Sequence, residues 1–259
     1  SGNGGGRMLK QKYDVIIIGA GPAGIFTALE LTALRPDIEA LIVDMGRSIA
    51  ARACPMRTTG QCMNCQPCAI VHGWAGAGAF SDGKLSLSPE VGGHITNYVS
   101  QKEAEALIRH ADDLYLRFGA PAHVHGLNDP KVDELRYEAS RHNIRLVPCP
   151  VRHLGTDHAG SVLGAMYDHL IGNTRTQFAE KTAAESLLVE DGKIAGVVLK
   201  TASGETVRCQ APFVVAAPGR GGAAWLARQI QALGLTASNN EVDIGVRVEV
   251  PNSVMDLSL

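Results

Sequence analysis

The stretch YDVIIIGAGPAG, residues 13–24, decides the fold of this chain. Its first half is a short run of β-branched apolar residues, which is typical of a strand buried on both faces of a parallel sheet. Its second half carries three glycines in the spacing G-x-G-x-x-G. Residues 25–34 continue as an apolar helix, and residues 40–43 (ALIV) predict a second buried strand. Together these segments predict a βαβ unit.

The glycine pattern has the context of a dinucleotide-binding fingerprint, because it follows a strand and opens a helix. Gly19 permits a tight turn, Gly21 lets the backbone approach a pyrophosphate, and Gly24 lets the helix pack closely on the strand. The helix amino terminus offers free N–H groups to phosphates. Asp44 follows the second strand, 20 residues after Gly24, where a carboxylate can accept hydrogen bonds from a ribose hydroxyl. The sequence therefore favours a bound dinucleotide over a tight turn without a ligand.

Three features favour FAD as that dinucleotide. The fingerprint lies near the amino terminus. Residues 73–83 (GWAGAGAFSDG) form a small-residue stretch that can lie against a flavin, and residues 214–222 form a second strand followed by glycines. An NAD-linked Rossmann enzyme without flavin is the alternative, and a colourless protein that binds NADH would support it.

The rest of the chain alternates between loops, helices and short strands. We expect an ordered loop at 46–93, helices at 104–118, 131–142 and 161–171, strands at 144–147, 211–217 and 244–250, and a hairpin at Asp191-Gly192. The predicted fold class is α/β, a Rossmann-like FAD-binding domain (a ββα sandwich with a parallel sheet) with a helical insertion. The predicted domains are an FAD-binding domain in two parts (8–93 and 144–243), the insertion (94–143) and the start of an incomplete substrate domain (244–259).

The motifs resemble those of FAD-dependent oxidoreductases of glutathione-reductase-like fold, and among these a poorly characterised group of bacterial FAD-dependent dehydrogenases. The motifs that carry the resemblance are DVIIIGAGPAG (14–24), Arg52-x-Cys54-Pro55, Cys62-x-x-Cys65-x-Pro67-Cys68, GWAGAGAFSDGKL (73–85) and FVVAAPGRGG (213–222). The superfamily usually has a late Gly-Asp motif and returns to the FAD domain after a substrate domain. Neither follows Val250, so we expect the chain to be truncated before the rest of the substrate domain.

The resemblance implies a set of cofactor contacts along the whole dinucleotide. They are Gly19, Gly21, Pro22, Ala23 and Gly24 at the pyrophosphate, Asp44 at the adenosine ribose, Gly76, Ala77, Phe80 and Ser81 near the isoalloxazine or ribityl chain, Ala184 at the adenine through its backbone, and Ala217, Pro218 and Gly219 closing over the cofactor.

Four cysteines, Cys54, Cys62, Cys65 and Cys68, fall within 15 residues. Thiolates at such spacing can converge on one soft metal, which would make an iron–sulfur or zinc site. The spacing differs from the ferredoxin run C-x2-C-x2-C-x3-C-P. A redox-active dithiol facing the flavin and inert structural thiols are the two other interpretations.

Catalytic residues are not apparent, and two side chains are weak candidates. Lys84 ends the SDGK segment, where its charge can lie near flavin N1, and His153 can face the substrate side of the flavin. For His153 a structural role is the more common alternative.

Composition and charge argue against some classes of binding partner. The formal net charge of −2, from 24 basic and 26 acidic side chains, argues against nucleic acid as a partner, and no apolar run is long enough to span a bilayer. Six cysteines without a secretory signal indicate a reducing compartment, the cytoplasm.

We therefore expect an FAD-dependent oxidoreductase that transfers hydride or electrons between an unknown small-molecule substrate or NAD(P)H and an acceptor. The alternative is an FAD-binding electron-transfer module or subunit that works with a redox partner protein, with an iron–sulfur cluster as a further possibility.

Overall fold

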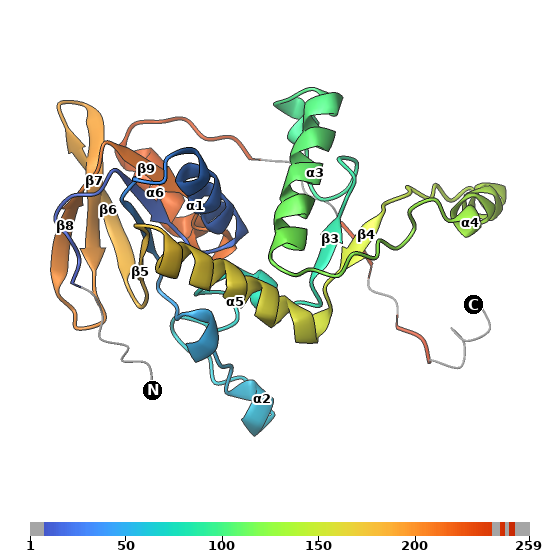
Figure 1. The fold of residues 1–259 in the computed structure, drawn as a ribbon, viewed down its shortest axis with the longest axis horizontal. Helices are drawn as coiled ribbons and strands as arrows, with labels where there is room; N and C mark the ends of the chain where they lie inside the picture. Colours follow the sequence, from blue (N-terminus) through green and yellow to red (C-terminus); the bar gives the residue numbers. More distant parts are fainter. Residues whose placement is uncertain (1–7, 240–243, 247–248, 252–259) are drawn as a thin grey trace.

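A parallel sheet forms the middle layer of the larger part of the molecule, on the left of Figure 1. The computed structural model describes residues 8–239, 244–246 and 249–251. The sheet has four strands in the order β5 (Gln177–Ala179), β2 (Ala40–Val43), β1 (Val15–Ile18) and β9 (Phe213–Ala216). Every residue of β1 and β2 is buried, as their apolar runs predict.

Different structures cover the two faces of this sheet. Helices α1 (Pro22–Leu34) and α5 (Gly155–Asn173) pack on one face, where their apolar side chains share a core with Val15 and Ile17. A three-stranded antiparallel sheet covers the other face, where Val197 and Leu199 pack against Ile16. Its strands are β6 (Ala183–Glu190), β7 (Lys193–Lys200) and β8 (Thr206–Gln210). The layers form the predicted ββα sandwich.

Local sequence explains the ends of several elements. Helix α1 begins at Pro22 directly after Gly21, because proline's fixed φ suits the first helical position and its missing N–H would be unpaired there anyway. Strands β6 and β7 are joined by Asp191 and Gly192, both with positive φ (50° and 73°), so the predicted hairpin is confirmed.

Residues 84–153 form an arm beside the sandwich. Its strands are β3 (Lys84–Ser86) and β4 (Val151–His153), which pair antiparallel, and its helices are α3 (Gln101–Arg117) and α4 (Pro130–Arg141). Helix α3 contacts α1, with the Phe26 and Tyr115 ring centroids 5.3 Å apart. Helix α4 projects away from the sheet at the far end of the arm (Figure 1).

Two predicted strands differ from the structure. Residues 144–147 are irregular, and the strand begins later, at Val151; Ile144 is 61% exposed, so its apolar character did not reflect burial. Of the strand predicted at 244–250, the described residues 244–246 and 249–250 have no strand, and 247–248 lie outside the described residues.

The remaining elements are short, apart from α6 (Ala223–Ala232). They are the helix α2 (Met56–Thr59) and the 3-10 turns η1 (Ile49–Ala51), η2 (Gly76–Phe80), η3 (Ile95–Asn97) and η4 (Arg220–Gly222).

Candidate functional site

A cleft runs along the carboxyl ends of β1, β2 and β9. It consists of two adjoining cavities of about 480 and 500 Å³. The first, the adenosine-side cavity, extends to β6 and α6; the second, the glycine-side cavity, is bounded by the start of α1 and by residues 76–78. Ligands of open α/β sheets bind in this position, where neighbouring strands connect in opposite directions. The two cavities meet at a waist lined by Gly19, Asp44, His72, Pro218 and Gly221.

The glycines of the fingerprint have distinct structural roles. A Cβ at Gly24 would lie 2.0 Å from the Gly19 carbonyl oxygen, so only glycine allows α1 to approach the strand so closely. Gly19 itself has a φ of 104°, and its Cβ would lie 2.1 Å from the Ala217 carbonyl oxygen. A Cβ at Gly21 would meet nothing within 4 Å. Gly21 therefore borders open space, as a glycine that admits a ligand should.

Asp44 holds three separate segments together at the waist. Its Oδ2 accepts a hydrogen bond from the Ala20 N–H (3.0 Å), and its Oδ1 accepts from the Gly46 (2.8 Å) and Gly73 (2.6 Å) N–H groups. A carboxylate offers about four acceptor positions, so one remains for a ribose hydroxyl. The predicted ribose contact and the observed structural role are compatible.

Arg52 organises the loop at the glycine-side cavity. Its guanidinium donates to the carbonyl oxygens of residues 69, 70, 74 and 76, at distances up to 3.2 Å, and lies 4.7 Å from the Phe80 ring centroid. Burial lowers the pKa of Arg52 to about 10, with Asp44 opposing the shift, so the side chain is charged at neutral pH. One half-buried cation thus fixes a loop that has little regular structure.

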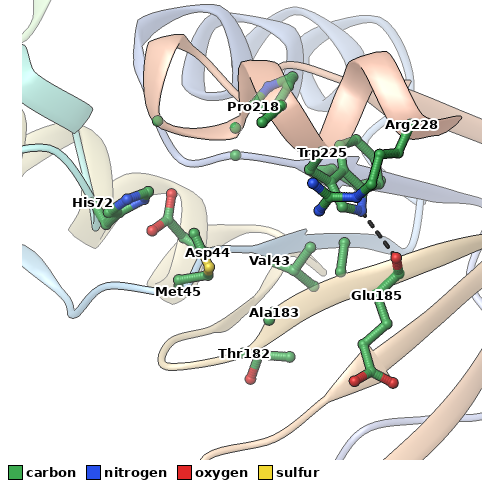
Figure 2. Close-up of a pocket in the computed structure, with 16 residues that line it drawn as sticks. Val43, Asp44, Met45, His72, Thr182, Ala183, Glu185, Pro218, Trp225 and Arg228 are labelled. Carbon is green, nitrogen blue, oxygen red and sulfur yellow. Dashed lines mark hydrogen bonds between the residues drawn. The ribbon is translucent and has the colours of Figure 1, made fainter. Parts of the chain in front are cut away.

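The adenosine-side cavity has an aromatic wall on α6. The Trp225 Nε1–H donates to the Glu185 carbonyl oxygen (3.1 Å), which fixes the indole ring, and Arg228 lies one turn further along the helix (Figure 2). Ala184 lines the opposite side, on β6. A flat apolar ring, a guanidinium and backbone polar groups suit a purine base.

Most of the predicted cofactor contacts line this cleft. Those that do are Gly19, Gly21, Pro22, Asp44, Gly76, Ala77, Ala184, Ala217, Pro218 and Gly219. Ala23, Gly24, Phe80 and Ser81 line neither cavity. Phe80 lies against the guanidinium groups of Arg52 and Arg57 instead, and the Ser81 hydroxyl donates to the Gly78 carbonyl oxygen.

The two weak catalytic candidates are neighbours in space. Lys84 and His153 are paired across β3 and β4, although 69 residues separate them in the sequence. The Lys84 ammonium lies 2.8 Å from the Asp82 carboxylate, and this hydrogen bond lowers the pKa of Asp82. Neither candidate lines the cleft. A direct catalytic role for Lys84 or His153 stays a prediction.

The structure does not bring the four cysteines together into a metal site. Within the described residues, no group of three or more His, Cys, Asp or Glu side chains could hold a metal ion. Cys62 is exposed and Cys54, Cys65 and Cys68 are half-buried. The iron–sulfur or zinc site stays a prediction, as do the redox dithiol and the structural thiols.

Sequence reasoning assigned no site role to His72, Trp225 or Arg228, which line the cleft, or to the half-buried Arg52, which organises the loop beside it. His72 lines both cavities, yet it lies in a loop with no periodicity. Trp225 and Arg228 are three residues apart, so the sequence could have placed them on the same face of a helix. Nothing in the sequence, however, indicated that this face borders the cleft.

The open space beside Gly21, the free first turn of α1 and the aromatic wall at the other end fit a dinucleotide with an adenine base. The fold and the site define the class: an α/β dinucleotide-binding protein with its ligand at the carboxyl ends of parallel strands.

The family comparison is more specific. The model of the FAD binding domain family matches residues 80–242, more than half of the chain, so the chain belongs to this family. The match begins after the Gly19–Gly24 fingerprint and Asp44. No curated protein matches the sequence.

Many solved structures resemble this chain, among them the following three. L-amino acid deaminase from Proteus vulgaris shares 15% identity and a TM-score of 0.50, covering 91% of this chain and 52% of that one. The 3-ketosteroid dehydrogenase of Rhodococcus jostii RHA1 shares 16% identity (TM-score 0.48, covering 81% and 46%). Glycine oxidase from Geobacillus kaustophilus shares 18% identity (TM-score 0.48, covering 88% and 60%). The chain spans about half the length of these proteins.

The comparisons confirm the predicted α/β FAD-binding fold. The flavin-free alternative is therefore set aside. In the part of the chain that the structure describes, no helix combines the length and apolarity needed to cross a membrane.

Proposed function

We propose that this chain is the FAD-binding part of a flavin-dependent dehydrogenase, of the bacterial group that its motifs resemble. The observation that carries the proposal is the two-part cleft, with a purine-sized aromatic wall at one end and the open turn at Gly21 at the other. Bound FAD would supply hydride or electron transfer between an unidentified small molecule or NAD(P)H and an acceptor. Residues 8–93 and 144–243 would form the FAD-binding domain, and residues 94–143 the insertion.

The chain's own residues would bind and orient the cofactor. Trp225 and the Ala184 backbone would hold the adenine, and the remaining acceptor position on Asp44 would take a ribose hydroxyl. The first turn of α1 would receive the phosphates, because Gly21 and Pro22 at its start line the cleft and the turn carries the positive end of the helix dipole. The loop fixed by Arg52 would exclude water from the flavin end.

Titration of the purified protein with FAD, followed by visible absorption and by quenching of flavin fluorescence, tests the proposal. The wild-type chain should take up one FAD, with a flavin spectrum that bleaches with dithionite. Gly21→Val should abolish uptake, because the new side chain occupies the space beside the phosphates without a clash in the fold. A Gly21→Val protein that binds FAD as the wild type does would contradict this binding mode.

Gly164→Val is the matched control. Gly164 lies in α5 and lines neither cavity, and outside the backbone of its own helix no atom lies within 4 Å of its Cβ position. This variant should bind FAD normally. A wild-type chain that takes up no FAD would overturn the proposal for this chain.

A second candidate is an FAD-binding electron-transfer module that works with a redox partner protein. Leu235, Ile244 and Val246, close to one another in sequence, are more than half exposed, which suits an apolar contact with another surface. Dye reduction by the isolated FAD-loaded chain with NADH or NADPH separates the candidates. Turnover in isolation favours the dehydrogenase, and turnover only after adding a cell extract favours the module.

A further inference from the structure

A third cavity, of about 600 Å³, lies next to the cleft but outside the path of the cofactor. We call it the Arg47 cavity. It shares only Met45 and His72 with the adenosine-side cavity, and only His72 with the glycine-side cavity. A dinucleotide that reaches from Trp225 to Gly21 therefore does not fill it.

Three basic side chains line the Arg47 cavity, and none of the described residues that line it is acidic. Arg47 follows the carboxyl end of β2, and Lys181 follows the carboxyl end of β5, the neighbouring parallel strand. The Lys181 N–H donates to the Gly46 carbonyl oxygen (2.7 Å), which holds these two segments together. Arg52 directly follows η1. Two adjacent strands and one loop thus bring three cations to one cavity.

Carboxylates do not balance these positive charges. Within the part of the chain that the structure describes, the side chains of Arg47 and Lys181 have neither a hydrogen bond nor an ion pair. The Arg52 guanidinium donates to carbonyl oxygens, which carry no net charge. Of the carboxylates nearby, Asp44 accepts three backbone N–H groups and Glu180 accepts one (2.7 Å). An anion in the cavity would compensate a charge that the protein itself leaves uncompensated.

The chemistry of the cavity wall favours a phosphate group. A phosphoryl group carries about −1.5 to −2 charges at neutral pH and three acceptor oxygens, so it can interact with several cations at once. Guanidinium and ammonium groups are common partners of phosphates in proteins. Much of the remaining wall is small and apolar, which suits the carbon skeleton of a small molecule; it includes Ala51, Ala53, Pro55, Pro67 and Ala69.

We propose that the Arg47 cavity is a second ligand site, which binds a phosphate group through Arg47 and Lys181. The phosphate is carried by a small metabolite or is the free ion. Arg52 adds its charge from the wall of the cavity and keeps its hydrogen bonds to the loop. This site goes beyond the proposed function, because its ligand is not FAD and neither Arg47 nor Lys181 lines the cleft.

Calorimetric titration of the FAD-loaded protein with glycerol phosphate, inorganic phosphate and glycerol, at neutral pH and constant ionic strength, tests the proposal. FAD fills the cleft, so the phosphates cannot bind in place of the cofactor. The wild type should bind the phosphates and not glycerol. Arg47→Gln and Lys181→Gln should each bind them about tenfold more weakly, the usual cost of losing one hydrogen bond to a charged group. Tighter binding of glycerol phosphate than of inorganic phosphate supports a metabolite as the ligand, and the reverse order supports the free ion.

Lys193→Gln is the control, because Lys193 is also an exposed lysine but lies in β7 and lines none of the three cavities. It should bind the phosphates as the wild type does. All three variants should take up FAD normally, since the replaced side chains are exposed and lie outside the cleft.

Two results overturn the inference. One is a wild type that binds neither phosphate, and the other is a pair of variants, Arg47→Gln and Lys181→Gln, that bind them as tightly as Lys193→Gln does. Failure of the wild type to take up FAD overturns the proposed function instead. The same comparison of variants in the FAD-free protein then still tests the phosphate site.

Discussion

The central sheet and the arm are held together by different forces. Every residue of β1 and β2 is buried between two apolar layers, whereas none of the 12 described residues of α4 is buried. The arm contacts the sandwich where α3 packs on α1, and inside the arm a buried ion pair, Arg152 with Asp112, ties β4 to α3. The cleft lies at the ends of the rigid strands, where packing fixes the backbone against which a cofactor must fit.

The largest expected effect breaks the ion pair that ties β4 to α3 within the arm. Arg152 is 4% exposed and forms a bidentate pair with Asp112, at 2.5 and 2.7 Å. Asp112→Ala leaves a buried guanidinium with only the Pro121 carbonyl oxygen as acceptor, so we expect a loss of about 3–5 kcal/mol in the free energy of unfolding. Urea unfolding followed by circular dichroism measures it. Exposed Asp113→Ala should change stability by less than about 0.5 kcal/mol. Equal effects of the two variants would show that the pair does not stabilise the arm.

The second prediction compares apolar side chains in the two regions. Ile17 is completely buried in β1, and removing its side chain leaves a cavity that costs about 2–5 kcal/mol on substitution to alanine. Leu135 in α4 is 60% exposed, so Leu135→Ala should stay within about 0.5 kcal/mol of the wild type. Thermal unfolding measures both. A large loss for Leu135→Ala would mean that α4 packs against something in solution.

The smallest effect concerns the loop rather than the fold. Arg52→Lys keeps the charge but loses the planar set of donors that holds four carbonyl oxygens. FAD affinity should fall about tenfold, equivalent to one net hydrogen bond lost at the flavin end. AMP affinity should stay unchanged, because AMP needs only the adenosine-side cavity. Arg57→Lys is the control, since Arg57 shares the contact with Phe80. Unchanged FAD affinity in Arg52→Lys would show that the loop holds its shape without the guanidinium.

The same comparison explains which parts of the fold the sequence predicted. Buried strands such as 15–18 and 40–43 need continuous apolar runs, and Gly24 is required wherever α1 lies so close to its strand; these signals are local. The strand predicted at 144–147 had the same apolar character but lies in the arm, where nothing covers Ile144. An apolar run forms a buried strand only where residues distant in the sequence pack over it. Whether they do so cannot be predicted from the run itself.

The sequence predicted the site residues whose positions follow from the backbone of one βαβ unit. It missed the residues whose positions depend on how a loop packs. Glycines at 19, 21 and 24 and the carboxylate at 44 have fixed spacings within one βαβ unit. His72 reaches the cleft, and Arg52 reaches the loop beside it, only because the irregular 46–83 segment folds back to the end of β2, anchored by the Gly73 N–H on Asp44. A loop without periodicity gives no pattern from which such a path can be predicted.

The three hydrogen bonds of Asp44 have a consequence for the cost of binding. Because one carboxylate already holds Ala20, Gly46 and Gly73 in place, the walls of the waist are ordered before any ligand arrives. Ordering mobile loops on binding consumes part of the interaction free energy, and a preorganised wall avoids that loss. The conformational entropy of these segments is therefore lost during folding and not on binding. The affinity of the cleft then depends mainly on the contacts that the ligand makes.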